Sequence, residues 1–251
     1  RGLGLEFVKQ LLGRDPDCRV VATCRDPSRA ESLHELDRAH PGRLFVTALD
    51  LTDPDSIARC SEEVKANFTD ELDLVLNVSG ILHVPGEMSP ETSLSRVNYD
   101  QMLVSFQTHA IGPALVSKAF WPMLQTCARA RQKEAAHGAV PLIVNMSARV
   151  GSISDNQLGG WYSYRASKSA LNQITKTTSV EFSRKKPKVA VISLHPGTCD
   201  TDLSAPFQKN YPKDKIFTKS FAVDKLLGVI DSVGEEQNGK FFAWDGAEIP
   251  W

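Results

Sequence analysis

Short, continuously apolar segments alternate with segments of helical periodicity along the whole chain. The apolar runs cover residues 19–24, 44–49, 72–76, 140–146, 189–194 and 240–244. Between them, apolar spacing and capping residues predict helices over residues 2–13, 27–40, 53–68, 97–127, 162–183 and 221–233. Strands that are apolar on both faces are typical of a parallel sheet covered by helices on both sides. The alternation therefore predicts an α/β fold with a doubly wound parallel sheet.

Size, charge and cysteine spacing limit the kinds of protein that this chain can be. Its 251 residues, 41% of them hydrophobic, can bury one full core, and no linker or repeat divides residues 1–251, so we expect a single domain. The net charge of −1 predicts no nucleic-acid partner and no membrane partner. Five cysteines without ligand spacing favour a reducing compartment and no metal site. Without a transmembrane span or secretory signal, we expect an intracellular protein of the cytoplasm or an organelle.

Tyr164 and Lys168 are four residues apart in a predicted helix. This spacing places both side chains on one face, where they can point into the same cleft. A phenol titrates at about pH 10, and a nearby ammonium group that favours the phenolate would bring the tyrosine pKa closer to neutrality. The pair is therefore a candidate for proton transfer. The simpler structural interpretation is a partly buried tyrosine beside a solvated lysine.

Polar and glycine residues follow several of the predicted strands. They are Arg25, Asp50, residues 77–80, Ser147 and Pro196-Gly197. In a parallel α/β sheet, ligands bind beyond the carboxyl ends of the strands. The helix that carries Tyr164 follows one of these ends directly. We therefore expect the tyrosine and the lysine at the same edge of the sheet as these residues.

Five segments form an ordered set of motifs. They are Arg1-Gly2-Leu3-Gly4, Asp50-Leu51, Asn77-Val78-Ser79-Gly80, Tyr164-x-x-x-Lys168, and Pro196-Gly197-Thr198 with Thr201. On these motifs the chain resembles, over essentially its whole length, the short-chain dehydrogenases/reductases, a family of Rossmann-type NAD(P)-dependent oxidoreductases. Ser152-Ile153 and residues 159–161 and 239–251 look most like the C-factor and sniffer-type carbonyl reductases.

The resemblance implies hydride transfer between nicotinamide and a carbonyl or alcohol substrate. Tyr164 would donate the proton, Lys168 would hold the ribose and lower the tyrosine pKa, and Ser147 would orient the carbonyl oxygen. Family members commonly form homodimers or homotetramers through the long helix and the Tyr164 helix. Besides Tyr164 and Lys168, the implied cofactor-binding residues are Arg1, Gly2, Leu3, Gly4, Asp50, Leu51, Asn77, Val78, Gly80, Pro196, Gly197, Thr198 and Thr201.

Arg25 bears on the choice of cofactor, because it follows the strand at residues 19–24. An acidic side chain there would bind the ribose hydroxyl of NAD, whereas an arginine suits the 2′-phosphate of NADP. Arg1 would add a second guanidinium group near the same phosphate. We therefore predict NADP(H). Alternatively, Arg25 is a surface arginine opposite Asp26.

The first departure from the family pattern lies at Arg1. In the family, a central strand and the first half of the phosphate loop precede the segment that Arg1 to Gly4 resembles. That strand, buried on both faces, is missing from this sequence. We therefore expect further residues upstream in the natural protein, and otherwise a damaged cofactor site.

A second departure concerns the serine that orients the carbonyl group. The family's serine stands three residues before a glycine; with Gly151 as that glycine, the position holds Ala148. Ser147 is one residue early, and neighbours on a strand face opposite sides, so Ser147 can serve only if the strand end is irregular. Ser152 is the other candidate.

Two further departures concern His109 and Val78. His109 occupies the position three residues before Gly112 where the family often has an asparagine. It either bonds a water near Lys168 or packs between helices, and a protonated imidazole would repel the lysine. Val78 replaces an asparagine in the third motif, where backbone groups make much of the cofactor contact.

Ala148 and His109 favour an alternative function, a catalytically weakened NADP-binding protein that acts through partners or cofactor sensing. The chain has no Gly-x-Ser-x-Gly motif, which argues against a hydrolase. Residues 202–220 combine aromatic residues with several lysines, and we predict that they form a mobile lid over the substrate.

Overall fold

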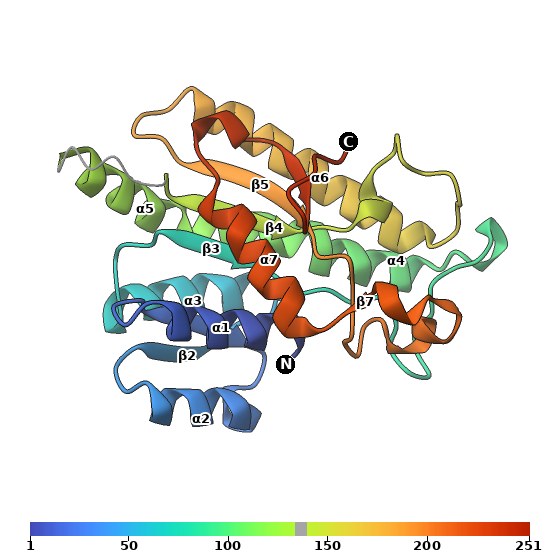
Figure 1. The fold of residues 1–251 in the computed structure, drawn as a ribbon, viewed down its shortest axis with the longest axis horizontal. Coiled ribbons are helices and arrows are strands. Elements are labelled where there is room, and N and C mark those ends of the chain that lie inside the picture. The colour runs from blue at the N-terminus through green and yellow to red at the C-terminus, as the bar shows by residue number, and fades with distance from the viewer. Residues whose placement is uncertain (134–139) are drawn as a thin grey trace.

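Strands and helices alternate in the computed structural model, which describes residues 1–133 and 140–251 (Figure 1). The main helices are α1 (Gly2–Arg14), α2 (Glu31–Ala39), α3 (Pro54–Asn67), α4 (Tyr99–Phe106), α5 (Gly112–Lys133), α6 (Tyr162–Ser183) and α7 (Lys219–Asp231). The strands are β1 (Val20–Cys24), β2 (Leu44–Ala48), β3 (Leu74–Asn77), β4 (Leu142–Met146), β5 (Ala190–His195), β6 (Thr198–Cys199), β7 (Ile216–Phe217) and β8 (Phe241–Ala243).

The paired strands run parallel, as predicted. β1 pairs with β2, and a four-stranded sheet has the order β3-β4-β5-β8. The short strands β6 and β7 form a further parallel pair. The β1–β2 pair is not hydrogen-bonded to the four-stranded sheet, in which β3 is an edge strand.

Helices cover both faces of the four-stranded sheet, which confirms the doubly wound prediction. On one face, Phe7 of α1 and Leu226 of α7 belong to the same buried cluster as Ile192 of β5. On the other face, α3, α5 and α6 pack in a second cluster that includes Val191. Neighbouring strand residues point to opposite faces of the sheet, so Val191 and Ile192 of β5 both have to be apolar. Figure 1 shows α1 and α7 in front of the strands and α3 behind them.

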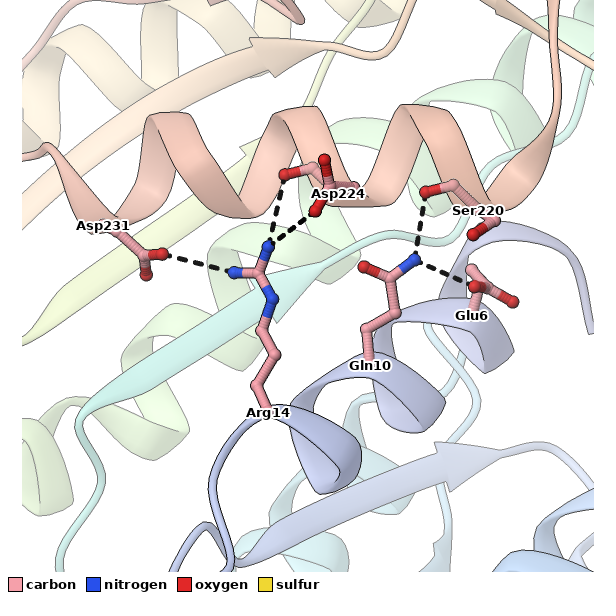
Figure 2. Close-up of polar contacts among 6 residues, drawn as sticks. All are labelled: Glu6, Gln10, Arg14, Ser220, Asp224 and Asp231. Atoms are coloured by element: carbon pink, nitrogen blue, oxygen red, sulfur yellow. Dashed lines mark hydrogen bonds and ion pairs between the residues drawn. The ribbon is translucent and has the colours of Figure 1, made fainter.

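Polar contacts join α1 to α7 along one side of their packing surface (Figure 2). The Arg14 guanidinium group donates to the carboxylates of Asp224 at 3.0 Å and Asp231 at 3.2 Å. The Gln10 amide donates to the carbonyl of Ser220 at 3.0 Å. Such exposed pairs contribute about 0–1 kcal/mol each. Apolar packing therefore holds the helices together, while the polar contacts fix how α1 is aligned on α7.

The predicted long helix at residues 97–127 is largely confirmed, with different ends and an irregular centre. It runs from Tyr99 through a π-helical segment, Gln107–Ile111, to Lys133. The irregular centre is this π-helical turn, which directly precedes Gly112. Gly112 has a packing role, because a Cβ there would lie 2.7 Å from the Cβ and the carbonyl oxygen of Leu51.

Candidate active site

Tyr164 and Lys168 lie one turn apart on α6, and both are buried, at 8% and 3% exposure. The Lys168 Nζ lies 5.7 Å from the centroid of the Tyr164 ring. It also donates a 2.8 Å hydrogen bond to the carbonyl of Met146, at the end of β4. The predicted shared face is therefore present, and the lysine is not solvated.

Burial shifts both pKa values toward the neutral forms. It raises the pKa of Tyr164 well above its ordinary value and lowers the pKa of Lys168 to about 7. The physical reason is that a charge on either group would lose its hydration. The predicted lowering of the Tyr164 pKa by Lys168 is thus wrong for this structure. A neutral phenol is nevertheless the form that can donate a proton.

Apolar side chains surround Tyr164. The residues that pack in this cluster are Leu82, Ala148, Val150, Trp161, Leu203 and Phe207. The Trp161 ring lies 6.1 Å from Tyr164 and 5.3 Å from Phe207, measured between centroids. The tyrosine is therefore enclosed by an aromatic and aliphatic wall.

The predicted lid, residues 202–220, has two parts with different surroundings. Leu203 and Phe207 pack in the cluster around Tyr164. Ile216–Phe217, in contrast, is strand β7, and Phe217 packs against Trp244 with centroids 4.6 Å apart. α7 begins at Lys219. Residues 203–207 therefore lie near Tyr164, whereas residues from 216 onward belong to β7 and α7, and a lid over the substrate stays a prediction.

Ala148, at the family's usual serine position, packs in the apolar cluster around Tyr164. Ser147 is 3% exposed, and its hydroxyl has no hydrogen-bond partner in the described part of the chain. The Ser152 hydroxyl accepts a 3.1 Å bond from the backbone N–H of Asp155 and so supports a turn. Ala148 therefore packs beside the tyrosine, the Ser152 hydroxyl is used in a turn, and the Ser147 hydroxyl is buried without a partner.

His109 is a buried link between three segments. Its Nε2 accepts from the backbone N–H of Ile81 at 2.9 Å, so its Nδ1 carries the proton and donates to the Ser167 hydroxyl at 2.8 Å. Ser167 in turn donates to the carbonyl of Tyr164 at 3.0 Å. Burial, with a smaller contribution from the charge of Lys168, holds the His109 pKa well below its ordinary range. Of the two alternatives, the packed histidine is the one observed, because both ring nitrogens already have protein partners.

Arg1, Gly2, Leu3 and Gly4 form the start of α1, which is available to an anion. No side chain caps this helix, and Gly2 has a left-handed φ of 59°. The first backbone N–H groups of a helix lack internal partners and attract negative charge. Arg25 is exposed after β1 and makes no ion pair among the described residues. These features fit a phosphate-bearing cofactor.

Asp50 and Leu51 follow β2 and have different roles. Hydrogen bonds from the backbone N–H and hydroxyl of Thr52 lower the Asp50 pKa, and the charge of Arg25 adds to this effect. Arg25 and Asp50 follow β1 and β2, whose last residues, Cys24 and Ala48, are paired, so both lie at the same edge of the sheet, as predicted. Leu51 packs against the second core cluster.

The third motif offers mainly backbone groups to a ligand. The Asn77 side chain donates to Asn145 at 2.8 Å inside the protein, and Val78 packs against the core. A Cβ on Gly80 would lie 3.5 Å from the His109 ring. The side chains of Asn77 and Val78 are therefore occupied within the fold, which agrees with a backbone contact at this place.

Pro196, Gly197, Thr198 and Thr201 form a tight turn and the short strand β6 after β5. Gly197 has a φ of 73°, and a Cβ there would lie 2.6 Å from the Phe217 ring. The Thr201 N–H donates to the Ser204 hydroxyl at 3.3 Å. This turn packs against Phe217 of β7.

Gly197→Ala should destabilise the protein by about 2–5 kcal/mol, because the new methyl group meets both a left-handed backbone and an aromatic ring. Gly42→Ala is the matched control: its φ is 75°, and a Cβ there would have nothing within 4 Å. It should cost only about 1–2 kcal/mol. Urea unfolding of the two variants measures the difference, and equal losses would contradict the close packing of Phe217.

Glu91 is a buried residue of this region that the sequence reasoning missed. Its carboxylate accepts from the backbone N–H of Ser163, at the start of α6. The sequence gives one hint of such a residue, which is the lack of a capping side chain directly before α6. Gly159, Gly160 and Trp161 precede α6 without a serine, threonine, aspartate or asparagine that could cap it.

The described residues contain neither a metal-binding cluster nor a membrane-spanning helix. Within residues 1–133 and 140–251, no group of three or more His, Cys, Asp or Glu side chains could hold a metal ion. In the same residues, no helix has the length and apolar character needed to cross a membrane. The five cysteines are free thiols.

Comparisons with known proteins agree with this architecture. The sequence model of the short chain dehydrogenase family matches residues 1–212. The C-signal protein of Myxococcus xanthus is 31% identical over 183 residues, which are 73% of this chain and 95% of that protein. The carbonyl reductase Sniffer of D. melanogaster matches with a TM-score of 0.87 and 30% identity, over 100% of this chain and 96% of that chain. The NADPH-bound carbonyl reductase from chicken fatty liver matches with a TM-score of 0.84 and 32% identity, over 100% and 95%.

Proposed function

This chain belongs to the short-chain dehydrogenase family, and from that premise we propose that it is an NADP(H)-dependent carbonyl reductase or alcohol dehydrogenase. The observation that carries the proposal is the buried pair of Tyr164 and Lys168 beneath an apolar wall. NADPH, when bound, supplies a hydride for the carbonyl carbon. The protein has to hold the substrate and deliver a proton to its oxygen.

Tyr164 supplies that proton. Burial keeps its phenol neutral at ordinary pH, so a proton is available for a carbonyl oxygen that gains negative charge. Lys168 is anchored by the Met146 carbonyl, and its pKa of about 7 lets it accept or release a proton near neutrality. We therefore assign proton donation to Tyr164 and cofactor contact to Lys168. Ser147 stays a predicted catalytic residue, since its unpartnered hydroxyl is still free to bond.

The substrate is an apolar carbonyl compound. Leu82, Trp161, Leu203 and Phe207 offer aromatic and aliphatic surface around the tyrosine. Ala148 adds no hydroxyl group to this wall. Such a surface excludes water and favours a ketone or aldehyde with an aromatic or branched aliphatic substituent.

Preference for NADP(H) is assigned to Arg25. Arg1 and the uncapped start of α1 would hold the remaining phosphates. The carbonyl reductase from chicken fatty liver has NADPH bound in its crystal structure, and that protein is 32% identical to this chain. Both observations support NADP(H).

We expect the protein to oxidise NADPH with an aromatic ketone or aldehyde, and Arg25→Ala to lower kcat/KM for NADPH at least about tenfold. The value for NADH should hardly change, because NADH lacks the 2′-phosphate. Arg38→Ala is the matched control, since Arg38 is an exposed arginine at the end of α2. Steady-state kinetics with both cofactors measures the preference. A wild type that neither binds nor oxidises NADPH would overturn the proposal.

Ala148 stands where the family has its serine, and this favours a second candidate function. In that case the chain would be a catalytically weakened NADP-binding protein. A single positioned hydrogen-bond donor contributes about a hundredfold or more to such reactions. We expect wild-type turnover well above that of Tyr164→Phe, and a gain below about tenfold for Ala148→Ser. A wild type as slow as Tyr164→Phe, with a far larger gain on Ala148→Ser, would support the second function instead.

Assembly and location stay predictions. Tyr99, Leu103 and Ile111 are exposed at 76%, 40% and 47% along the long helix through which a homodimer or homotetramer is predicted. Sedimentation of the purified protein measures its mass directly. The intracellular location stays a prediction, and the five free cysteines agree with a reducing compartment.

A further inference from the structure

The start of α6 has an unusual backbone. Gly159, Gly160 and Trp161 have φ values of 63°, 66° and 52°, so three successive residues are left-handed. Trp161 is the one residue other than glycine with a positive φ in the described ranges, 1–133 and 140–251. A bulky side chain in this conformation is strained and persists only where its surroundings hold it. Trp161 is also the residue whose ring contacts both Tyr164 and Phe207.

Glu91, in the loop between β3 and α4, stabilises this backbone conformation of Trp161. Its backbone carbonyl accepts from the Trp161 N–H at 2.5 Å. Its carboxylate oxygens accept from the Ser163 N–H at 3.3 and 3.2 Å, and the Ser163 hydroxyl donates to the same carboxylate. Glu91 and Ser163 are 3% and 1% exposed. One buried glutamate therefore binds two residues of the segment that leads into Tyr164.

The carboxylate replaces a missing helix cap. Trp161 occupies the N-cap position of α6, and its side chain makes no capping hydrogen bond. Negative charge at the start of a helix is favourable, because the N–H groups there lack partners and carry the positive end of the helix dipole. Glu91 makes no ion pair among the residues that the structure describes. The helix start and the Ser163 hydroxyl are thus its stabilising partners, and displacing it would leave a buried charge unsatisfied.

We propose that Glu91 is a positioning residue, which holds Trp161 and Tyr164 in their places in the substrate pocket by capping α6 from a distant loop. This inference rests on the proposed function, because its consequence is for carbonyl reduction. The hydrogen bonds of Glu91 go to Trp161 and Ser163 rather than to Tyr164. Glu91 therefore acts on the tyrosine through these two residues.

Two measurements on the protein test this proposal. Hydrogen exchange should show that Glu91→Ala speeds exchange of the Trp161 and Ser163 amides at least about tenfold, while amides in the second half of α6 stay protected. Kinetics should show kcat/KM for an aromatic ketone falling at least about tenfold, with the Kd for NADPH changed less than about twofold. Glu87→Ala, at an exposed glutamate of the same loop, is the control and should change neither.

Glu91→Ala could act simply by unfolding the protein, so Ser163→Ala is a second, milder variant. It removes only the hydrogen bond from the Ser163 hydroxyl to Glu91. It should show smaller changes in the same direction, and adding Ser163→Ala to Glu91→Ala should cause no further loss. Unchanged exchange in Glu91→Ala, or faster exchange with unchanged kcat/KM, would overturn the proposal. An inactive wild type would instead overturn the proposed function, while the exchange result would still decide whether Glu91 holds residues 161–164.

Discussion

Tyr164→Phe is expected to lower kcat for carbonyl reduction at least about a hundredfold, the usual contribution of a positioned proton donor. The substitution removes one hydroxyl group and keeps the ring that packs against Leu82 and Ala148. Folding and NADPH binding should therefore persist, with the Kd changed less than about twofold. Stopped-flow turnover and a fluorescence titration with NADPH measure the two quantities on the same sample.

Tyr162→Phe is the matched control for this experiment. Tyr162 lies two residues away on α6 and is 36% exposed, outside the cluster around Tyr164. Its variant should keep wild-type kcat. If Tyr164→Phe were as active as Tyr162→Phe, Tyr164 could not be the proton donor, and the proposed mechanism would fall.

Lys168→Met should lower turnover as strongly as Tyr164→Phe does. It should also raise the stability of the folded protein. The loss of the amine removes the proposed cofactor contact and should lower kcat/KM at least about a hundredfold. Methionine has a similar length and no charge, so it removes the cost of a buried ammonium group. The lost hydrogen bond to Met146 offsets about 1 kcal/mol of that gain. Lys176→Met, at an exposed lysine two turns further along α6, is the control.

The stability difference between Lys168→Met and wild type should depend on pH. The Lys168 pKa is about 7 in the folded protein and about 10.4 in an unfolded chain. Below pH 7 the lysine is protonated in both states, so the cost of burying its charge is complete. Between pH 7 and about 10.4 only the unfolded state holds the proton, and wild-type stability rises by up to about 1.4 kcal/mol per pH unit from this group. The advantage of the variant should therefore be largest below pH 7 and shrink as the pH rises.

Urea unfolding of both proteins at pH 6, 8 and 9.5 measures this difference. Burial also raises the pKa values of Cys60, Cys127 and Cys199, to about 11, 12 and 12. These groups weaken folding at alkaline pH, but they are common to both proteins and cancel in the difference. A stability difference that stays constant from pH 6 to 9.5 would show that Lys168 is not a buried amine with a lowered pKa.

The helices and strands followed closely from the sequence, because their signals are local. α6 begins at Tyr162 and ends at Ser183 as predicted, and Asp53 caps α3 through its bond to the Asp55 N–H. Errors arose where a distant contact changed the backbone. The π-helical turn at Gln107–Ile111 brings His109 between Ile81 and Ser167, and helical periodicity alone gives no sign of either partner.

The candidate site was predictable only in part. The spacing of Tyr164 and Lys168 predicted their common face, and the motifs after the strands predicted which loops would meet. Of the wall around Tyr164, only a contribution from residues 202–220 was expected; Leu82 and Trp161 were not, because they come from other segments of the chain. The pKa directions were missed for the same reason, since they depend on burial by those segments.

By itself, the sequence determined the order and type of the elements, the parallel sheet, the family, and the helix face that carries Tyr164 and Lys168. These properties depend on periodicity and on spacing between near neighbours, which local backbone geometry converts into structure. Only the tertiary structure decided that Ala148 packs in the cluster around Tyr164, that His109 links three segments, and that the Glu91 carboxylate accepts from the start of α6. Those contacts join residues far apart in the chain, and which side chains meet is set by how whole elements pack.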